Sequence, residues 1–451
     1  MSVAVRVHRA FGLTLVAGGA IVVAAASAAL TASDSEMAAP AAAGWGASWE
    51  PTPVPLAPAR PDVPWLQRLV DEAAPGSVLA LAPGTYSGPV LVTKPLTIDG
   101  GGQATIDGGG RGTVFTLETN GAVVRGLRFT NSGDSHATDD ACLNVRGHNN
   151  TVESNRLDDC LFGIDLKQSN GNTVRANQIR SKRVDLGQRG DAIRLWYSMN
   201  NRIESNVIAD ARDMVVWYSN GNLFAGNSAT RSRYSLHFMY SQHNVVERNH
   251  YHDNAVGIYV MYTEGVQVRN NRISHSTGAT GMGIGFKEAS ETIVEGNDIV
   301  YCAIGVSSDL SPYQPDSKNA VRGNRIAYNG VGIQFVGDKI GTTIEDNVFE
   351  GNLAHVMVSP GASAERNTWR NNFWDDYQGF DRNRDGVGDT PYELYAYADR
   401  IWMELPYARF FKNAPLLEAL DFLERLAPFS NPTRLLADPA PRFLKPQVTT
   451  P

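Results

Sequence analysis

The sequence is poor in the features that mark several common protein classes. Only three of its 451 residues are cysteines, which is too few, and an odd number, for a disulfide framework. Basic residues do not predominate: 40 Lys and Arg stand against 47 Asp and Glu, so the formal net charge is −7 and a nucleic-acid binder is not expected. Charged residues make up 19% and hydrophobic residues 42%, which excludes an intrinsically disordered chain.

Asparagine is absent from the first 119 residues and abundant afterwards. Of 32 Asn, 30 lie between Asn120 and Asn383, and the chain holds 43 Gly. Both residues tolerate turns and left-handed backbone conformations. The middle of the chain is therefore predicted to form many short strands joined by turns.

The amino terminus has the pattern of an export signal. Arg6, His8 and Arg9 precede an apolar run at 11–30, which contains small residues at 26–28 of the kind a signal peptidase accepts. We predict a signal peptide at 1–30, with a retained membrane anchor as the alternative, since roughly 20 apolar residues can also span a bilayer. The Ala- and Pro-rich stretch at 31–63 is predicted to be a linker.

A unit of the form Asn-x-φ-x-x-Asn-x-φ, where φ is apolar, recurs about every 22 residues. Such a short period, with occasional longer insertions, is typical of stacked coils with loops on one side. Each unit also contains a short strand with period-2 alternation, such as Ile193–Trp196, which favours a β-helix over helix-pair repeats. Its second Asn falls at Asn155, Asn177, Asn206, Asn227, Asn249, Asn271, Asn297, Asn324, Asn347 and Asn367.

The predicted fold is all-β, a right-handed single-stranded parallel β-helix of roughly eleven coils at 64–375, with a short amino-terminal cap helix. An Asp-rich loop is expected at 376–393. The segment 394–451 has helical spacing from Leu394 to about Pro428 and is predicted to be an α-helical carboxy-terminal tail that caps the solenoid or docks on a partner. Cys142, Cys160 and Cys302 are interpreted as small buried side chains, not as disulfide partners.

The register of the repeat separates core residues from surface residues. Two columns, Ile193/Met214/Leu236/Ile258 and Leu195/Val216/Phe238/Val260, are uniformly apolar and are predicted to line the core. Alternation then places two other columns on the outer face. These columns are Arg194/Val215/His237/Tyr259 and Trp196/Trp217/Met239/Met261.

The outer columns predict a candidate metal site and a partner surface. His237, Met239 and Met261 combine imidazole and thioether ligands, which suit a soft cation such as Cu(I) better than Ca²⁺ or Mg²⁺. The alternative is that these side chains pack under a loop or a partner protein. A contiguous exposed apolar patch marks a binding surface, so Trp196, Trp217 and Tyr259 are predicted to contact a partner. Lys287, Glu288 and Asp309 end this patch with charge.

A second candidate metal site lies in the Asp-rich loop. Asp381, Asn383 and Asp385 at positions 1, 3 and 5, the Val387 carbonyl at position 7 and Asp389 at position 9 follow the first part of a calcium-loop pattern. The pattern departs at position 12, where Tyr392 replaces Glu. A structural calcium ion is predicted, and a turn held by side-chain hydrogen bonds is the alternative.

Two other classes of function remain open. Many parallel β-helices cleave or epimerise polysaccharides, and a polysaccharide lyase or epimerase would need acid and base groups on one face. A purely structural docking rod is the third hypothesis. The residues available for an enzyme site are Asp191, Arg194, Arg212, Asp213 and Arg231.

Several long tracts resemble the NosD family of exported maturation factors for nitrous oxide reductase, whose members share the carbohydrate-binding and sugar-hydrolase type of β-helix. The resemblance covers most of the chain after the linker. The tracts that carry it are 212–219, 233–240, 309–312, 379–383, 395–400 and 422–429.

The resemblance implies a periplasmic protein that assists denitrification and is not an enzyme. Such proteins help to assemble the copper–sulfide cluster of nitrous oxide reductase, with copper or a sulfur species as cargo. The implied partners are an ABC transporter permease in the cytoplasmic membrane, a small copper chaperone and nitrous oxide reductase itself. The apolar tail from Leu394 becomes a candidate for docking on the permease.

Overall fold

The structure is a computed structural model that describes residues 66–278, 280–337, 339–359, 363–396 and 433–446, together with 414–415, 419 and 422–423. The predicted signal peptide and linker, and most of the predicted tail, lie outside these residues. Within the described part of the chain, no helix is both long enough and apolar enough to cross a membrane.

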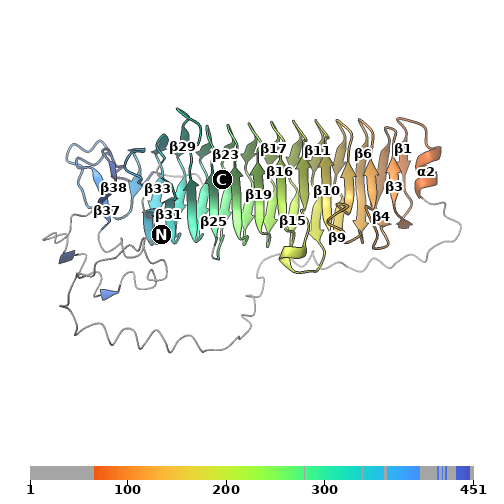
Figure 1. The fold of residues 1–451 in the computed structure, drawn as a ribbon, viewed down its shortest axis with the longest axis horizontal. Coiled ribbons are helices and arrows are strands. Elements are labelled where there is room, and N and C mark those ends of the chain that lie inside the picture. The colour runs from red at the N-terminus through yellow and green to blue at the C-terminus, as the bar shows by residue number, and fades with distance from the viewer. Residues whose placement is uncertain are drawn as a thin grey trace, which may run out of the picture. The chain divides into compact units, whose positions relative to one another are not determined.

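The described residues form a parallel β-solenoid (Figure 1), as the repeat predicted, but it has about 13 turns where roughly eleven coils were expected. Helix α2 (Leu66–Glu72) precedes the first coil at the end where the predicted cap helix was expected. Its Leu66 and Val70 are buried, one turn apart, so the helix covers the core at this end. The only other regular helix among the described elements is the 3₁₀ turn η1 (Leu186–Gln188).

Most coils of the solenoid contribute three short strands, which stack on the strands of the next coil, while two longer strands at 97–107 and 123–130 each take part in two stacks. One stack is a separate twelve-stranded parallel sheet, and the other two belong to a single 24-stranded sheet. The twelve strands of the separate sheet are β3 (Val90–Val92), β5 (Phe115–Leu117), β7 (Ala141–Val145), β10 (Phe162–Lys167), β13 (Ile193–Trp196), β16 (Asp213–Trp217), β19 (Tyr234–Met239), β22 (Val256–Met261), β25 (Met282–Lys287), β28 (Ile304–Asp309), β31 (Val331–Phe335) and β34 (Ala354–Val358).

The 24-stranded sheet carries the Asn-containing turns. Its first stack holds β1 (Val78–Ala80), β4 (Thr97–Asp107), β6 (Val123–Thr130), β8 (Thr151–Glu153), β11 (Thr173–Arg175), β14 (Arg202–Glu204), β17 (Leu223–Ala225), β20 (Val245–Glu247), β23 (Gln267–Arg269), β26 (Ile293–Glu295), β29 (Asn319–Arg322), β32 (Thr342–Glu345) and β35 (Thr368–Arg370). Its second stack holds β2 (Gly84–Ser87), β9 (Arg156–Cys160), β12 (Gln178–Ser181), β15 (Val207–Ala209), β18 (Ser228–Thr230), β21 (His250–His252), β24 (Arg272–Ser274), β27 (Asp298–Val300), β30 (Arg325–Ala327), β33 (Val348–Glu350) and β36 (Phe373–Trp374).

The predicted core columns are confirmed by register and burial. Ile193 pairs with Met214, Leu236 with Ile258, and Phe238 with Val260 on the neighbouring strand. All eight predicted core residues are at most 1% exposed. The sheet is held by this continuous apolar interior because each coil alone is too small to bury its own hydrophobic face.

Buried asparagines form a hydrogen-bonded ladder along the solenoid. In a typical step, the backbone N–H and the side-chain Nδ2 of Asn206 both donate to Oδ1 of Asn227, at 3.0 Å each, and Nδ2 also donates to the carbonyl of Val174 at 2.9 Å. Each amide therefore satisfies polar groups of its neighbouring coils. The predicted column is wrong at its last member. Asn372 continues the ladder after Asn347. Oδ1 of Asn367 instead accepts from the N–H of Thr342, in the column that the first Asn of each repeat unit forms.

The ladder ends on a carboxylate from the carboxy-terminal segment. Asp438 is fully buried, and its Oδ2 accepts from the N–H of Asn372 at 3.1 Å, from its Nδ2 at 3.0 Å and from Nε1 of Trp374 at 3.3 Å. An asparagine in place of Asp438 would have an NH2 group with no following coil to accept its hydrogen bonds, whereas a carboxylate only accepts. Asp438 belongs to β38 (Thr433–Asp438), which pairs antiparallel with β37 (Tyr392–Ala396).

This two-stranded sheet corrects part of the predicted helical tail, because residues 392–396 and 433–438 are extended. Helical residues are present between the two strands at Pro415, Ala419, Phe422 and Leu423. The strands form where the chain must supply partners for the last coil, which overrides local helical spacing.

The interpretation of all three cysteines as unpaired was wrong. Cys142 and Cys160 form a disulfide with 5.4 Å between their Cα atoms, while Cys302 is buried and free. The two partners lie 18 residues apart, in β7 and β9, so the bond crosses the interior of the solenoid between its two sheets. A disulfide fits an exported protein, because such bonds persist in oxidising compartments.

Candidate functional site

The predicted outer columns lie side by side on strands β13, β16, β19 and β22. Val215 pairs with His237 and Trp217 with Met239, and on the next strand His237 pairs with Tyr259 and Met239 with Met261. Neighbouring strands are about 4.8 Å apart. The parallel register thus brings together all three predicted copper ligands.

His237 and Met261 are in direct contact across two strands. Nε2 of His237 lies 3.2 Å from Sδ of Met261. Bonds of about 2.0 Å to nitrogen and 2.3 Å to sulfur, the values for a zinc ion, place two ligand atoms of one ion roughly 3.5 Å apart. The observed contact therefore needs to open by only a small amount to hold a metal ion. Met239 stands in register with Met261 and supplies a second thioether.

The environment of His237 keeps its imidazole uncharged. The residue is 6% exposed. Burial lowers the pKa of His237 to about 4, with Arg233 adding to this effect and Asp213 opposing it. The second ring nitrogen, Nδ1, is buried without a hydrogen-bond partner. A neutral imidazole is the form that binds metals, so His237 has the protonation state of a ligand at neutral pH.

Aromatic rings surround this histidine. The ring of Trp217 meets it edge to face at 6.3 Å and 87°, the Tyr234 ring lies at 5.0 Å, and the Tyr259 ring stacks at 6.1 Å. Trp196 packs edge to face on Trp217 at 5.7 Å. Both tryptophans and Tyr259 are half-buried, which is compatible with the predicted partner surface.

A column of stacked tyrosines beside the tryptophans was missed in the sequence. Tyr197, Tyr218, Tyr240 and Tyr262 stack in sequence, with ring centroids 4.9, 5.2 and 5.2 Å apart. All four have positive φ angles, between 49° and 52°, at the end of their strands. The signal was visible, since each tyrosine follows a Trp or Met of the outer column directly and precedes Ser or Thr.

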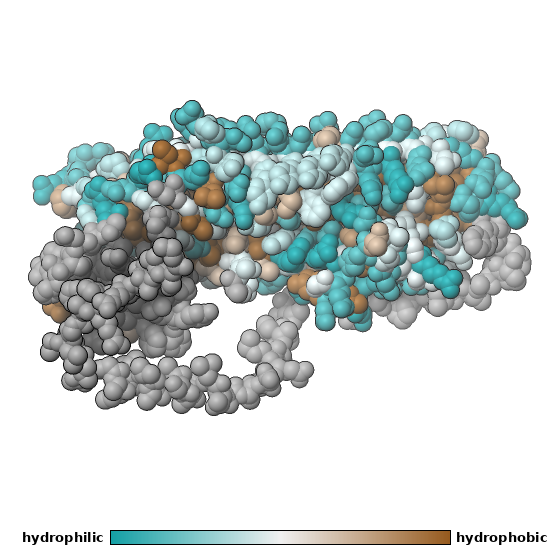
Figure 2. Space-filling view, in the orientation of Figure 1, coloured by the Kyte–Doolittle hydropathy of each residue, from teal (hydrophilic) through white to brown (hydrophobic). Residues whose placement is uncertain are grey.

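The patch ends where the sequence predicted. Met261 pairs with Lys287, and Lys287 pairs with Asp309. In the view of Figure 2 the solenoid surface is mostly hydrophilic, and residues of intermediate hydropathy gather over its middle coils. The pairing of Met261 with Lys287, and of Lys287 with Asp309, therefore ends the aromatic and thioether patch on this side.

Each Asp and Arg residue considered for an enzyme site is engaged in an ion pair. Arg212 donates to Oδ1 of the buried Asp191 at 2.9 Å, and Arg233 pairs with Asp213. Arg194 donates to Asp165 at 2.8 Å, and Arg231 pairs with Asp210 on another turn. Burial raises the pKa of Asp191 to about 6, with the nearby Arg212 opposing this shift. These ion pairs hold the coils together next to the histidine.

The Asp-rich loop has the hydrogen bonds of a tight turn. The backbone N–H groups of Asp385 and Gly386 donate to the two oxygens of Asp381, at 3.2 and 2.9 Å, and that of Arg382 donates to Asp389 at 2.7 Å. The side chain of Tyr392 at position 12 points to Asp376 instead. The backbone is thus folded as a loop, but the side chain at position 12 adds no ligand to it.

A further cluster, not found from the sequence, lies at the carboxy-terminal end. Nε2 of His355 is 2.9 Å from Oδ1 of Asp375 and 3.3 Å from Oδ1 of Asp376, and these ligand-type atoms lie within 4.8 Å of one another. The Nδ2 group of Asn352 lies 3.4 Å from Nδ1 of His355. Oδ1 of Asn352 accepts from Asn329, which sets the orientation of the Asn352 amide. Its Nδ2 therefore donates to Nδ1 of His355, and Nε2 of His355 carries the proton that faces the carboxylates.

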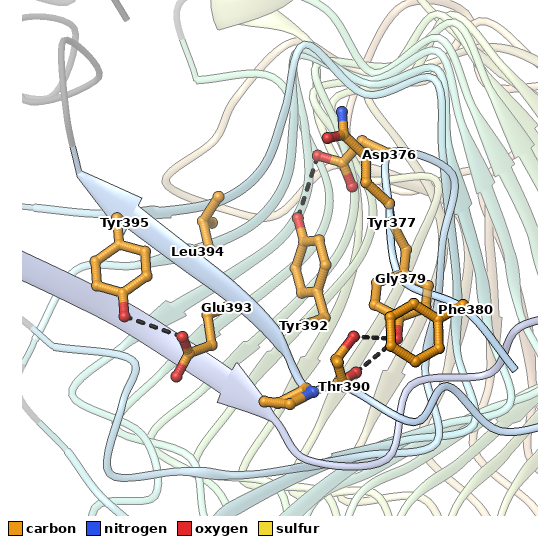
Figure 3. Close-up of a pocket in the computed structure, with 11 residues that line it drawn as sticks. Asp376, Tyr377, Gly379, Phe380, Thr390, Tyr392, Glu393, Leu394 and Tyr395 are labelled. Carbon is orange, nitrogen blue, oxygen red and sulfur yellow. Dashed lines mark hydrogen bonds between the residues drawn. The ribbon is translucent and has the colours of Figure 1, made fainter. Parts of the chain in front are cut away.

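Asp376 also borders a pocket of about 660 Å³ (Figure 3). Within it, Tyr392 donates to Asp376 at 3.3 Å, Tyr395 to Glu393 at 3.0 Å and Tyr377 to the Thr390 carbonyl at 2.6 Å. None of the predicted copper ligands lines this pocket.

Comparison with known proteins finds one family model and two curated proteins that carry the same name, NosD. Residues 176–379 match the family described as "Periplasmic copper-binding protein (NosD)", and residues 76–260 match a family of unknown function, DUF1565. A protein of Pseudomonas aeruginosa named "Probable ABC transporter binding protein NosD" is 28% identical over 386 residues, which cover 77% of this chain and 84% of that protein. A Stutzerimonas stutzeri protein of the same name is 32% identical over 111 residues, which cover 24% of this chain and 26% of that protein.

Among solved structures, the A-module of the Azotobacter vinelandii mannuronan C-5 epimerase AlgE6 is similar, with a TM-score of 0.52 and 18% identity over 66% of this chain and 94% of that one. This likeness shows the solenoid fold alone. The family match spans the four strands that carry the candidate copper site. Residues 176–379 thus match the NosD family model, and the chain is similar to proteins named NosD.

Proposed function

We propose that this chain is a periplasmic copper-handling accessory protein, with His237, Met239 and Met261 as the ligands of a transiently bound copper ion. The observation that carries the proposal is the 3.2 Å contact between the neutral imidazole of His237 and the thioether of Met261. Thioether and imidazole ligands favour Cu(I) over hard cations. The copper-binding description of the matching family and the disulfide of an oxidising compartment support the same role.

Copper is the cargo in this proposal, and nitrous oxide reductase is its destination. The names of the homologues support association with an ABC transporter. Trp196, Trp217 and Tyr259 form the partner surface next to the site, where a small copper chaperone delivers the ion. The tail beyond Leu394 is the segment that docks on the permease. Calcium at Asp381, Asn383, Asp385, Val387 and Asp389 has a structural role in holding the terminal loop.

An anaerobic Cu(I) titration tests the site. The unaltered protein is expected to bind one ion, and the double variant Met239→Leu/Met261→Leu to lose this binding. Met282→Leu is the matched control, since Met282 is a half-buried methionine in β25 outside the ligand column. Equal affinity in all three proteins would contradict the proposal.

The destination is tested by deleting the protein in its native host. The proposal expects nitrous oxide reductase that lacks its copper–sulfide cluster but retains its other copper centre. A fully metallated reductase from the deletion strain would contradict the assembly role. A polysaccharide lyase or epimerase is the alternative function. It has less support, because the acidic groups in its candidate cluster are engaged by arginines.

A further inference from the structure

Trp217 occupies the position that faces the copper site from the preceding coil. It ends β16, and its register partner on β19 is Met239, which in turn pairs with Met261. Its indole ring meets the His237 ring edge to face at 6.3 Å. The column therefore runs from an indole directly to the two thioethers, with the imidazole beside them.

The indole of Trp217 is not held in place by a hydrogen bond. Its Nε1 is buried and has no partner. Two other tryptophans of the solenoid do use this group: Trp369 donates to the carbonyl of Ala364 at 2.9 Å and Trp374 to Asp438 at 3.3 Å. Leaving a buried donor unpaired is unfavourable. What Trp217 contributes at this position is thus its aromatic face and its bulk.

An aromatic face next to a soft cation has two chemical effects. The π-electrons attract a cation, and tryptophan does so best among the aromatic residues. A bulky ring beside a metal site can also exclude the water or extra ligand that would complete a four-coordinate shell. Cu(II) prefers tetragonal nitrogen and oxygen ligands, whereas thioethers select Cu(I).

We propose that Trp217 closes the copper site, so that it accepts a monovalent soft ion with two thioethers and one imidazole and excludes divalent ions and water. This inference rests on the proposed function and deepens it. Trp217 is the residue that determines specificity, and His237, Met239 and Met261 are the ligands.

The test uses Ag(I), a soft monovalent ion that does not change its oxidation state, along with Cu(I) and Zn²⁺. Trp217→Phe and Trp217→Leu are compared with Trp196→Phe and Trp196→Leu, which change the neighbouring ring of the same column. We expect Trp217→Leu to weaken Ag(I) and Cu(I) binding roughly 3- to 30-fold, the range of a cation–π contact, and Trp217→Phe to have a smaller effect. The preference for Ag(I) over Zn²⁺ is expected to fall in parallel. The Trp196 variants are expected to retain both affinity and preference.

Tryptophan fluorescence provides an independent readout. Ag(I) is expected to quench the emission of the unaltered protein and of Trp196→Phe, and this quenching is expected to be lost in Trp217→Phe. Circular dichroism of each variant checks the fold, and Trp217→Phe removes an unpaired donor rather than a hydrogen bond.

Unchanged affinity, preference and quenching in the Trp217 variants would overturn the inference. If Met239→Leu/Met261→Leu still loses binding in that case, the proposed copper ligands remain supported. If the unaltered protein binds neither Ag(I) nor Cu(I), the proposed function and the inference both fail.

Discussion

Two buried histidines on the same twelve-stranded sheet have opposite electrostatic surroundings. His237 in β19 and His355 in β34 are 6% and 7% exposed. Burial lowers the pKa of His237 to about 4 because no carboxylate contacts its ring. Burial acts in the same direction on His355, but hydrogen bonds and charge from Asp375 and Asp376 outweigh it and raise its pKa.

The difference shows that partners, and not depth, decide what a buried histidine does. Desolvation disfavours the charged imidazole at both sites, and only adjacent carboxylates reverse this. In the proposed copper site, the uncharged His237 keeps a lone pair for a soft metal ion. His355 keeps a proton, and it joins the last coil to the residues that follow β36. The first region is suited to binding cargo, and the second to holding the carboxy-terminal end.

The strongest test of the comparison is copper affinity after removal of each histidine. We expect His237→Phe to weaken Cu(I) binding by at least about 100-fold, since loss of a direct ligand should cost no less than loss of an outer-shell partner, which costs 10- to 100-fold. His355→Phe is the matched control and is expected to bind Cu(I) as the unaltered protein does. Competition with a chromogenic Cu(I) chelator measures both. Equal losses in the two variants would break the distinction.

A smaller effect is expected on the stability of the last coils. His355→Phe removes hydrogen bonds to two carboxylates, and such charged bonds contribute about 1.5–3 kcal/mol each when buried. The side chains of Asp375 and Asp376 are 37% and 54% exposed, so solvent screening reduces this to about 1–2 kcal/mol in all.

Hydrogen exchange of peptides covering β34 and β36 measures this loss locally, because unfolding of a long solenoid is not expected to be two-state. Protection in β19 should stay unchanged. An equal loss of protection in β19 would show that His355 acts on the whole solenoid instead of its end.

The two sites are also expected to give the stability of the protein a pH dependence of opposite sign. As pH falls from 6.5 towards the folded pKa of about 4, the unfolded chain binds a proton that folded His237 does not, so stability falls by up to about 1.4 kcal/mol per pH unit. The folded pKa of His355 is raised, so its stabilisation is present below pH 6.5 and is lost as pH rises through the folded value. The lowered pKa values of Asp375 and Asp376 add stabilisation that is lost in acid.

Local hydrogen exchange across pH 4–8 therefore separates the two residues. His237→Phe should remove part of the acid sensitivity around β19, and His355→Phe should remove the loss of protection around β34 above pH 6.5. The comparison fails if His237→Phe leaves the acid sensitivity around β19 unchanged, or if His355→Phe leaves the loss of protection around β34 above pH 6.5 unchanged.

Much of the fold was predictable because the repeat has a fixed phase. The spacing of the asparagines and the alternation in Ile193–Trp196 and its equivalents predicted the solenoid and its core columns. The register of the outer columns was also predicted, but two of their members, Val215 and His237, are buried, with 1% and 6% exposure. Parallel stacking places residues at the same position of successive repeats side by side. The proximity of His237, Met239 and Met261 therefore followed from their positions within the repeat.

Contacts that break the repeat were not predictable in this way. The Cys142–Cys160 disulfide joins residues of different phase across the core, and the His355 cluster joins one coil to the segment beyond the last one. The stacked tyrosines recur at the same position of successive repeats. They were not predicted, because their positive φ angles place them beyond the alternating strand residues.

By itself, the sequence determined the solenoid, its register and the identity of the side chains on its outer face, since a short repeat converts spacing directly into stacking. Only the tertiary structure decided which polar groups are charged, paired or buried alone, because desolvation and ion pairing depend on neighbours from other coils. It also decided how the ladder ends. Asp438 is distant from Asn372 in sequence, yet its carboxylate accepts the donors that a further asparagine would otherwise have received.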